Sequence, residues 1–470
     1  MRKLLLAGAA GVGALMLASP QASAQTTQTT APTATGPQIR NEPGLSVRLA
    51  GRYRMYAAFA NQDFANNGGF VNANTPAVQP ASVQNGSFDM FDYARLWFGF
   101  DGMAANGLRY GSQLEVRMSD GSGSRGSGRG TLQYRRMYGY VATPTLGQLR
   151  VGSGQVRASE LMYTGHMNGN IATGLWDGDM PAAIIGGAGS ASLFWFSASN
   201  GNNMTAITYL SPQFFGFDAG LSYAPSDGNF GGDSSCGVPT LANGGTTCDR
   251  LSETNLDAGT AARLRNIYDV MLRYRGSFGP VGLVVSGGLV GAESIGATGT
   301  AQSYQNVLVG IGGTQVSFAG FTVGGIITGG RANYAATTRT NQNLAFTNPA
   351  SGATTSYGAG SPLRPLPSDG NNDNLFTWEV GAMYTIGPFT VGVAYHEATY
   401  EGSIASAANA KDRGLGIGGS YAVAPGMNLY AEYLYGRREE NGVNLQTGQL
   451  GAANKKTTAN VFGVGLAFNW

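Results

Sequence analysis

The sequence contains few charged residues, few histidines and cysteines, and no long hydrophobic run beyond its amino terminus. Charged residues make up 12% of the chain, whereas soluble globular proteins carry about 25%. A surface of the usual water-soluble kind is therefore not expected. The formal net charge of +2 falls to 0 when Arg2 and Lys3 are removed, which argues against a nucleic-acid partner bound through bulk charge.

Histidine and cysteine are too rare to favour a catalytic or metal site. The histidines are His166 and His396, the cysteines are Cys236 and Cys248, and a structural zinc site takes four such ligands close together. Neither histidine lies in a catalytic spacing, so we expect ordinary polar residues, no enzyme activity, no catalytic residue, no metal and no cofactor. The cysteines lie in a Gly-, Asn- and Thr-rich stretch, where we expect one loop disulfide in an exported protein.

The amino terminus has the features of a secretory signal peptide. Two basic residues precede an apolar run over residues 4–17, and Ala22-Ser23-Ala24 forms an A-x-A cleavage site. A membrane helix is the alternative, but the run is shorter than the ~20 apolar residues that a span needs. We predict a signal peptide over residues 1–24, followed by a flexible lead-in over residues 25–44, which are rich in Thr, Pro and Gln.

The carboxyl-terminal stretch alternates with the two-residue period of a β-strand. One face carries the bulky apolar side chains of Phe462, Val464, Leu466, Phe468 and Trp470, and the other carries small residues and an asparagine. Successive side chains of a strand point to opposite faces. The pattern is therefore typical of a membrane strand with lipid outside and a polar lumen inside.

The first predicted strand separates apolar residues from arginines. One face holds Leu45, Val47, Leu49, Tyr53, Met55 and Phe59, and the other holds Ser46, Arg48, Arg52 and Arg54. Three arginines opposite a lipid-compatible face indicate a water-filled interior.

Turn signals divide residues 45–470 into alternating short and long connections. Seven tight connections are predicted at 101–106, 143–148, 211–213, 279–280, 319–320, 387–388 and 424–426. Eight long ones are predicted at about 61–87, 119–130, 154–202, 225–263, 291–303, 334–374, 401–410 and 439–455. Together they predict one all-β domain, a 16-stranded antiparallel transmembrane β-barrel with both termini at the end of the short turns. Residues 281–290 and 307–333 are apolar on both faces or slip in phase, so their facing stays open.

Several segments resemble the general porins of Gram-negative outer membranes. Residues 93–102 with 106–108 resemble the second strand and first turn of that family, and residues 132–141 with 146–152 its fourth and fifth strands. Residues 203–223 resemble its sixth and seventh strands. The last strand resembles the family's terminal signal, although that signal usually ends in Phe and here ends in Trp470.

The resemblance implies a homotrimer of water-filled barrels in the bacterial outer membrane. Such a protein would contact outer-membrane lipid and the barrel-assembly machinery, and would pass small hydrophilic solutes and ions by passive diffusion. The family's third long connection folds into the barrel and narrows it, and here that connection is residues 154–202. Its carboxylates are Glu160, Asp177 and Asp179, for which solvated loop positions are the alternative.

We predict a basic pore wall on the early strands. Its members are chosen by their alternate positions along the predicted strands and by the resemblance, and they are Arg48, Arg52, Arg54, Arg95, Arg117, Arg135 and Arg150. Positions at the rim or at a subunit contact are the alternative for each of them. Arg135 and Arg136 cannot both point inward, because neighbours on a strand face opposite ways. At the sixth strand, where the family often has another inward arginine, the chain has Asn202-Asn203-Met204.

A general diffusion porin is the predicted function. Arginines on one wall and carboxylates on the other would set up a field across the pore that orients polar solutes. A substrate-selective outer-membrane channel is the alternative, and a line of aromatic residues along the lumen would favour it. A barrel enzyme would need a nucleophile, a base and an orienting group at one rim, and the sequence contains no motif for these.

Overall fold

The computed structural model describes residues 43–62, 87–119, 132–154, 156–167, 205–226, 263–295, 306–331, 344–347, 354–357, 374–400, 410–440 and 455–470. The predicted signal peptide, most of the predicted lead-in and both cysteines lie outside these ranges.

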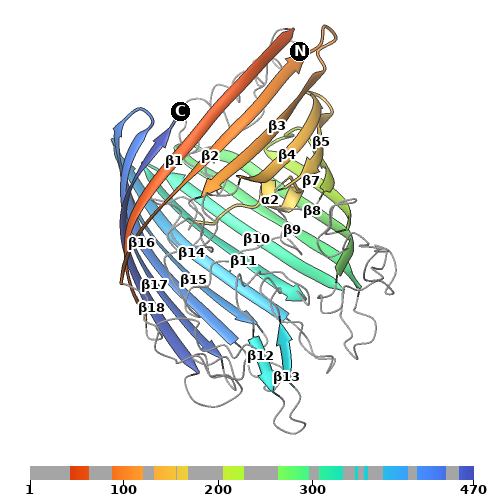
Figure 1. Ribbon diagram of the computed structural model, residues 1–470. Helices are drawn as coiled ribbons and strands as arrows, with labels where there is room; N and C mark the ends of the chain where they lie inside the picture. The colour runs from red at the N-terminus through yellow and green to blue at the C-terminus, as the bar shows by residue number, and fades with distance from the viewer. Residues whose placement is uncertain are drawn as a thin grey trace, which may run out of the picture.

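Sixteen antiparallel strands close into one barrel (Figure 1). They are β1 (Gly44–Gln62), β2 (Phe88–Met103), β3 (Arg109–Ser119), β4 (Leu132–Thr143), β5 (Gly147–Ser153), β6 (Thr205–Leu210), β7 (Phe217–Ser226), β8 (Arg263–Phe278), β9 (Val281–Ile295), β10 (Val307–Phe318), β11 (Phe321–Arg331), β14 (Asn374–Ile386), β15 (Phe389–Tyr400), β16 (Ala410–Ala424), β17 (Met427–Glu440) and β18 (Lys456–Asn469). Each strand pairs with its neighbours in the chain, β11 pairs with β14, and β1 pairs with β18. The predicted 16-stranded antiparallel barrel is confirmed.

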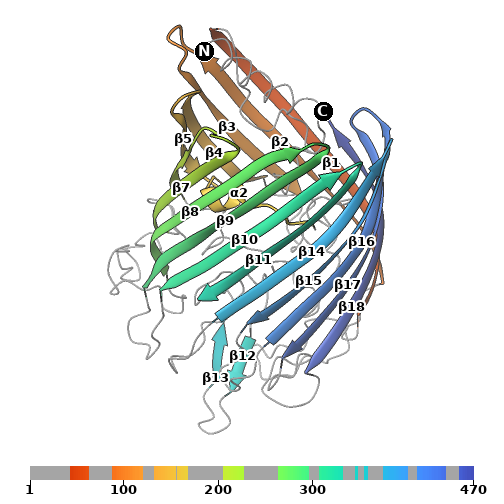
Figure 2. The same ribbon diagram turned by 180° about the vertical axis from the view of Figure 1, so that it is seen from behind.

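A separate two-stranded sheet lies within the predicted long connection of residues 334–374. Its strands are β12 (Leu344–Thr347) and β13 (Thr354–Tyr357). Figure 2 shows this hairpin beyond the end of the barrel wall, next to β14. These two strands were not predicted from the sequence.

The register gives the barrel an apolar outer face and a more polar inner one. In β1, Val47 is 81% exposed and Leu49 is 61% exposed, whereas Arg48 and Arg52 are 7% and 3% exposed. Directly paired residues share a face of the sheet, and Arg52 pairs with Arg95 on β2 and Asn469 on β18, which carries the division across three strands. The bulky apolar side chains of β1 and β18 therefore lie on the exposed face, and the arginines of β1 lie on the buried face.

The short connections lie where the turn signals predicted them. Gly279, Gly320 and Gly387 have φ values of 59°, 84° and 54° in two-residue turns, a left-handed conformation that glycine adopts without steric cost. The Asn469 N–H donates to the Gly426 carbonyl over 2.7 Å. The carboxyl terminus is therefore beside a short turn, as predicted.

The short helix α2 (Ala158–Met162) and the extended residues after it lie against the inner wall (Figures 1 and 2). Val156, Ala158, Met162 and Tyr163 form one buried apolar cluster with inner-face residues that include Ile267, Met271, Val290, Val309, Ile311 and Ile326. One face of β9, β10 and β11 thus points outward and the other meets this segment, which explains why these strands are apolar on both sides. Within the described ranges, no helix combines the length and the apolar character that a membrane crossing requires.

Candidate functional site

The candidate site is the inner wall of the barrel, and its first part is a group of arginines that we call the basic wall. Among the described side chains, its members are Arg48, Arg52, Arg54 (β1), Arg95 (β2), Arg109, Arg117 (β3) and Arg136 (β4). The described carboxylates on the same inner face of these strands are Asp101 and Glu115. The basic wall therefore has seven cations against two anions. Arg109 and Arg136 were not among the predicted pore-lining residues.

Both carboxylates of the basic wall are tied to arginines. Arg48 donates to Asp101, which also accepts from the Tyr140 hydroxyl. Glu115 is fully buried and lies 3.5 Å from Arg95 Nη1, 3.7 Å from Arg117 Nε and 3.5 Å from Arg136 Nε. Three guanidinium groups therefore converge on this one carboxylate, whose negative charge reduces the repulsion between them.

A β-bulge decides which of two adjacent arginines joins the basic wall. Glu115 pairs with Arg136, and the next residue of β3, Val116, pairs with Tyr134. Arg135 is the extra residue between them, and its side chain is outside the described set. A bulge cannot be recognised from strand parity, because it shifts that parity by one residue.

Arg150 lies farther around the wall, on β5. Its guanidinium carbon is 5.1 Å from the centroid of the Tyr138 ring, and its Nε donates to Gln148 over 2.8 Å. Arg150 pairs with Tyr140 and Thr208, and both of these residues are buried on the inner face.

Aromatic side chains are interleaved with the arginines and were not among the predicted pore-lining residues. The inner-face rings are Tyr56, Phe91, Tyr93, Trp97, Tyr138, Tyr140 and Tyr430. Tyr56 stacks on Phe91 with centroids 4.6 Å apart and an interplanar angle of 9°. The two-residue alternation of the strands could have identified these rings, because they occupy the same inward positions along each strand as the neighbouring arginines.

The segment that follows β5 is held on β8 by Asp269. This buried carboxylate accepts from the Arg157 guanidinium, with Arg157 Nε 3.0 Å away, and from the backbone N–H of Ser159 over 3.2 Å. Ala158 N–H donates to Ser222 Oγ on β7 over 2.6 Å. Asp269 and Ser222 therefore each accept from one backbone N–H at the start of α2, the usual role of a capping side chain.

Glu160 is the predicted loop carboxylate that the structure describes. It is partly exposed as a residue, but its Oε2 is buried and has no hydrogen-bond partner among the described residues. Burial raises the pKa of its carboxyl to about 7; Arg157 and Arg136 oppose this shift, and Asp269 adds to it. Asp177 and Asp179 lie outside the described ranges.

The other end of the segment contacts a carboxylate on β14, and the second histidine of the chain lies on the neighbouring strand. His166 Nδ1 lies 2.6 Å from Glu379 Oε2 on β14, and the Met167 N–H donates to the other oxygen. His396 on β15 pairs with Glu379 and shares its inner face. In the part of the chain that is described, no group of three or more His, Cys, Asp or Glu residues is placed to hold a metal ion.

Glycines on the inner wall make room for the backbone of this segment. A Cβ added at Gly313 on β10 would collide with the Thr164 carbonyl oxygen, and one added at Gly165 would collide with the carbonyl oxygen of Gly325 on β11. Cβ atoms added at Gly324 and Gly381 would meet Met167 atoms at 2.7 and 2.6 Å. The segment therefore seats directly against the wall of β10, β11 and β14.

Comparisons with known proteins agree with this architecture. A family model described as Gram-negative porin matches residues 9–442, and no curated protein matches the chain in sequence. OmpF of Salmonella typhi, solved with daunomycin, is similar with a TM-score of 0.53 and 11% identity over 90% of this chain and 97% of that one. The anion-selective porin of Comamonas acidovorans is similar with a TM-score of 0.48 and 15% identity over 91% and 100% of the two chains.

These structural similarities concern the fold, whereas the family match concerns the sequence itself. That match covers most of the chain, and the matched chain closes into a sixteen-stranded barrel. The protein therefore belongs to the Gram-negative porin family, whose members form diffusion channels in the outer membrane.

Proposed function

We propose that this porin passes small hydrophilic solutes and ions through a lumen narrowed by the segment that starts at Gly154. The supporting observation is how residues 156–167 are held: Arg157 contacts Asp269 on β8, and His166 contacts Glu379 on β14. Strands β9, β10 and β11 lie between these two anchors. A segment that runs along the inner face of these strands reduces the cross-section of the lumen that is open to solutes. We therefore assign the constriction to this segment.

We also propose a modest preference for anions. The described side chains of the basic wall include seven guanidinium groups and two carboxylates, and a surface of one sign inside low-dielectric walls concentrates ions of the other sign. Glu160, Asp177 and Asp179 are assigned to the constriction segment, where they would moderate this preference.

Ion selectivity measured in planar bilayers tests both proposals. With a potassium chloride gradient across the membrane, we expect an ohmic conductance that grows with salt concentration and a reversal potential of the anion-selective sign. Complete absence of conductance would contradict the channel itself, and a cation-selective reversal potential would contradict only the charge assignment.

A solute-selective channel is the second candidate, and the inner-face rings favour it. Seven aromatic side chains lie along the described inner wall, and rings along a pore give flat or apolar solutes a surface to contact. Liposome swelling separates the two functions. A general porin admits solutes in order of size, whereas a selective channel admits one class with a rate that saturates.

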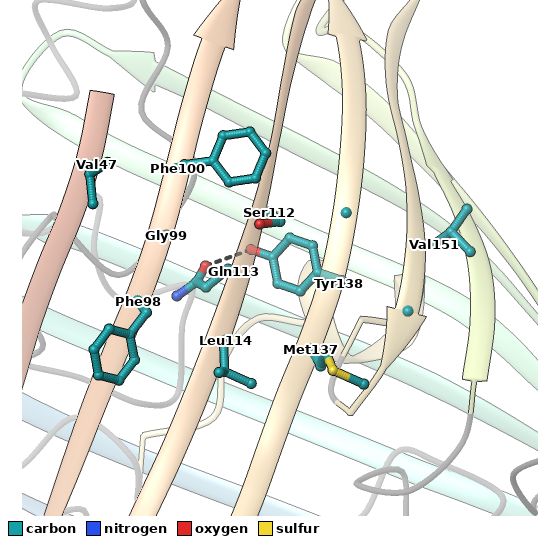
Figure 3. Close-up of a pocket in the computed structure, with 12 residues that line it drawn as sticks. Val47, Phe98, Gly99, Phe100, Ser112, Gln113, Leu114, Met137, Tyr138 and Val151 are labelled. Carbon is teal, nitrogen blue, oxygen red and sulfur yellow. Dashed lines mark hydrogen bonds between the residues drawn. The ribbon is translucent and has the colours of Figure 1, made fainter. Parts of the chain in front are cut away.

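We further propose a homotrimer in outer-membrane lipid, inserted by barrel-assembly machinery after signal-peptide cleavage behind Ala24. The outer face of β1 to β5 offers an apolar groove of about 620 Å³ for side chains of a second copy. Phe98, Phe100, Leu114, Met137 and Val151 line it around Ser112 (Figure 3). Sedimentation of the detergent-solubilised protein tests for three copies, and mass spectrometry of the mature protein tests both the cleavage site and the proposed Cys236–Cys248 disulfide.

A further inference from the structure

The outer face of the barrel carries a group of charged side chains near the long connections of β15 to β18, and we propose that this group binds the phosphate of an anionic lipid headgroup. We call it the outer charged cluster, and its members are Glu397 (β15), Lys411 and Arg413 (β16), Arg437 and Glu439 (β17) and Lys456 (β18). The inference concerns the surface that faces lipid, so it does not depend on what passes through the lumen.

The strand register places the cluster on the outer face. Arg413 pairs with Glu397 on one side and with Arg437 on the other, and directly paired residues share a face of the sheet. Ile417, four residues after Arg413 on β16, lies on that same face and is 50% exposed. A second row of pairs on this face, one step nearer the long connections, is formed by Lys411, Glu439 and Lys456.

The cluster lies at the edge of the apolar outer surface. In Figure 1 the strands β15 to β18 run side by side, and their ends at the long connections lie at the lower end of the barrel. Trp378 and Tyr395 are beside the cluster on the outer face, with ring centroids 5.3 Å apart, and such rings are typical of the boundary between hydrocarbon and water. Charges on the lipid face destabilise a barrel least near this boundary. The cluster is therefore placed at the level of the lipid headgroups.

The positive charge of the cluster exceeds its negative charge. Its described side chains are four cations and two carboxylates, which leaves a net charge of +2. Arg413 Nε donates to Glu397 over 2.7 Å, and Arg437 donates to Glu439 through Nη2. Arg437 Nε is buried and has no hydrogen-bond partner among the described residues. A phosphate monoester carries a charge of about −1.5 to −2 at neutral pH, which is close to the excess.

Two arginines of the cluster stand directly opposite each other. Arg413 pairs with Arg437 across β16 and β17, and like charges in this arrangement destabilise the pairing of strands. The Cβ atoms of such a pair are about 5 Å apart, so both guanidinium groups can reach one phosphate. Guanidinium groups bind phosphate oxygens through strong, often bidentate hydrogen bonds. A phosphate between the two arginines would therefore replace repulsion with attraction to both.

The surface next to the cluster favours a lipid over a free phosphate. Ile417, Tyr433 and Phe462 lie on the outer face of the same strands, toward the short turns, and are 50%, 37% and 48% exposed. Acyl chains of a lipid whose phosphate binds the cluster would cover these side chains. The proposed subunit contact is on the outer face of β1 to β5, so it leaves β15 to β17 to lipid.

Lipid binding to the full-length, delipidated protein in detergent tests the proposal. Phosphatidic acid is the probe, because its headgroup is a phosphate monoester, and phosphatidylcholine with the same acyl chains is the reference. Native mass spectrometry detects the lipids that stay bound. We expect phosphatidic acid to bind at a concentration roughly threefold to tenfold lower than phosphatidylcholine. Glycerol 3-phosphate, the same headgroup without acyl chains, should not displace the bound lipid at equal concentration.

Matched variants separate the cluster from the net charge of the protein. Arg413→Gln combined with Glu397→Gln removes one cation and one carboxylate, and should abolish the preference for phosphatidic acid. Arg265→Gln combined with Glu293→Gln removes an ion pair with the same Nε–Oε2 distance of 2.7 Å between β8 and β9, and should keep the preference. Lys456→Gln, at the exposed first residue of β18, should weaken the preference while leaving both ion pairs intact. Electrophoresis without heating confirms that each variant is a folded barrel.

Four results would overturn the proposal. They are equal binding of the two lipids to the wild-type protein, an unchanged preference in either variant of the cluster, an equal loss of preference in the β8–β9 variant, and displacement of the lipid by glycerol 3-phosphate. None of them contradicts the proposed diffusion function, because that function is tested by conductance and not by lipid binding.

Discussion

At the scale of single residues, Glu160 is the described loop group whose charge changes near neutral pH. Its pKa is raised to about 7, chiefly by burial. The carboxyl is neutral below that pH and carries a negative charge above it, so raising the pH adds an anion to the proposed constriction. We therefore expect the anion preference to weaken as the pH rises from about 6 to about 8.

Reversal potentials in a fixed salt gradient across this pH range measure that change. Glu160→Gln keeps the site neutral, so its anion preference should stay near the acid value of the wild-type protein throughout. Glu397→Gln is the matched control, because Glu397 pairs with Arg413 and Trp378 away from the inner face. If Glu160→Gln showed the wild-type pH dependence, another group would have to be responsible.

The basic wall shows how far residue-level prediction from the sequence could go. Arg48, Arg52, Arg54 and Arg95 lie on the inner face where parity put them. The alternation along β4 could not predict that Arg136 faces inward, because the bulge at Arg135 depends on how β4 pairs with β3. Ion pairs such as Arg157 with Asp269 join residues 112 positions apart, and no local pattern reports such a partner.

At the scale of elements, the seating of the inner segment depends on glycines at particular positions. Gly313 faces the segment, and a Cβ there would collide with the Thr164 carbonyl oxygen. We expect Gly313→Ala to push residues 164–167 off the wall, because backbone cannot yield as a flexible side chain can. The open-channel current should then become noisier and its mean conductance should rise.

The adjacent Gly312 provides a matched control for the same substitution. A Cβ at Gly312 would meet only Ile327 side-chain atoms, at 3.6 and 3.9 Å, which is ordinary van der Waals contact. Gly312→Ala should therefore conduct as the wild-type protein does, with a stability change within about 0.5 kcal/mol. Single-channel recordings of Gly313→Ala and Gly312→Ala test this prediction. Identical traces would mean that the position of the segment does not depend on a glycine at residue 313.

The same segment explains which strands the sequence could not orient. β1 and β18 alternate between lipid and lumen, so their facing could be predicted. In β10, Val309 and Ile311 face inward yet are apolar because Tyr163 and Met162 belong to the same buried cluster. The two-residue period is lost wherever an inner face is covered by protein instead of water, and that cover comes from residues more than 140 positions earlier.

At the scale of the whole molecule, the number of strands followed from turn chemistry. Glycines at left-handed positions, such as Gly279 and Gly387, mark short turns at one end, and long polar stretches mark the other. Closure into a barrel could be predicted because a sheet that faces lipid cannot leave the backbone of an edge strand unpaired. The hairpin of β12 and β13 could not be predicted in this way, because it lies within a connection and outside the barrel's alternation.

Closure brings the carboxyl-terminal residue onto the first strand. The Gly51 N–H donates to the Trp470 carbonyl over 3.0 Å, and the Trp470 N–H donates to the Gly51 carbonyl over 3.1 Å. The indole lies so close over Gly51 that an added Cβ would overlap its ring. Gly51 is therefore the position on β1 that lets the terminal aromatic residue dock.

We expect Gly51→Ala to hinder barrel closure. The substitution must displace the indole or break this pair of backbone hydrogen bonds, at a cost of about 1–3 kcal/mol. Refolding into detergent micelles, followed by electrophoresis without heating, measures the fraction of compact barrel, which should fall in this variant. Gly139→Ala on β4 is the control, since a Cβ there meets only the Gly111 carbonyl oxygen at 3.6 Å. Equal folded fractions in the two variants would show that closure at the β1–β18 seam does not depend on the docking of Trp470.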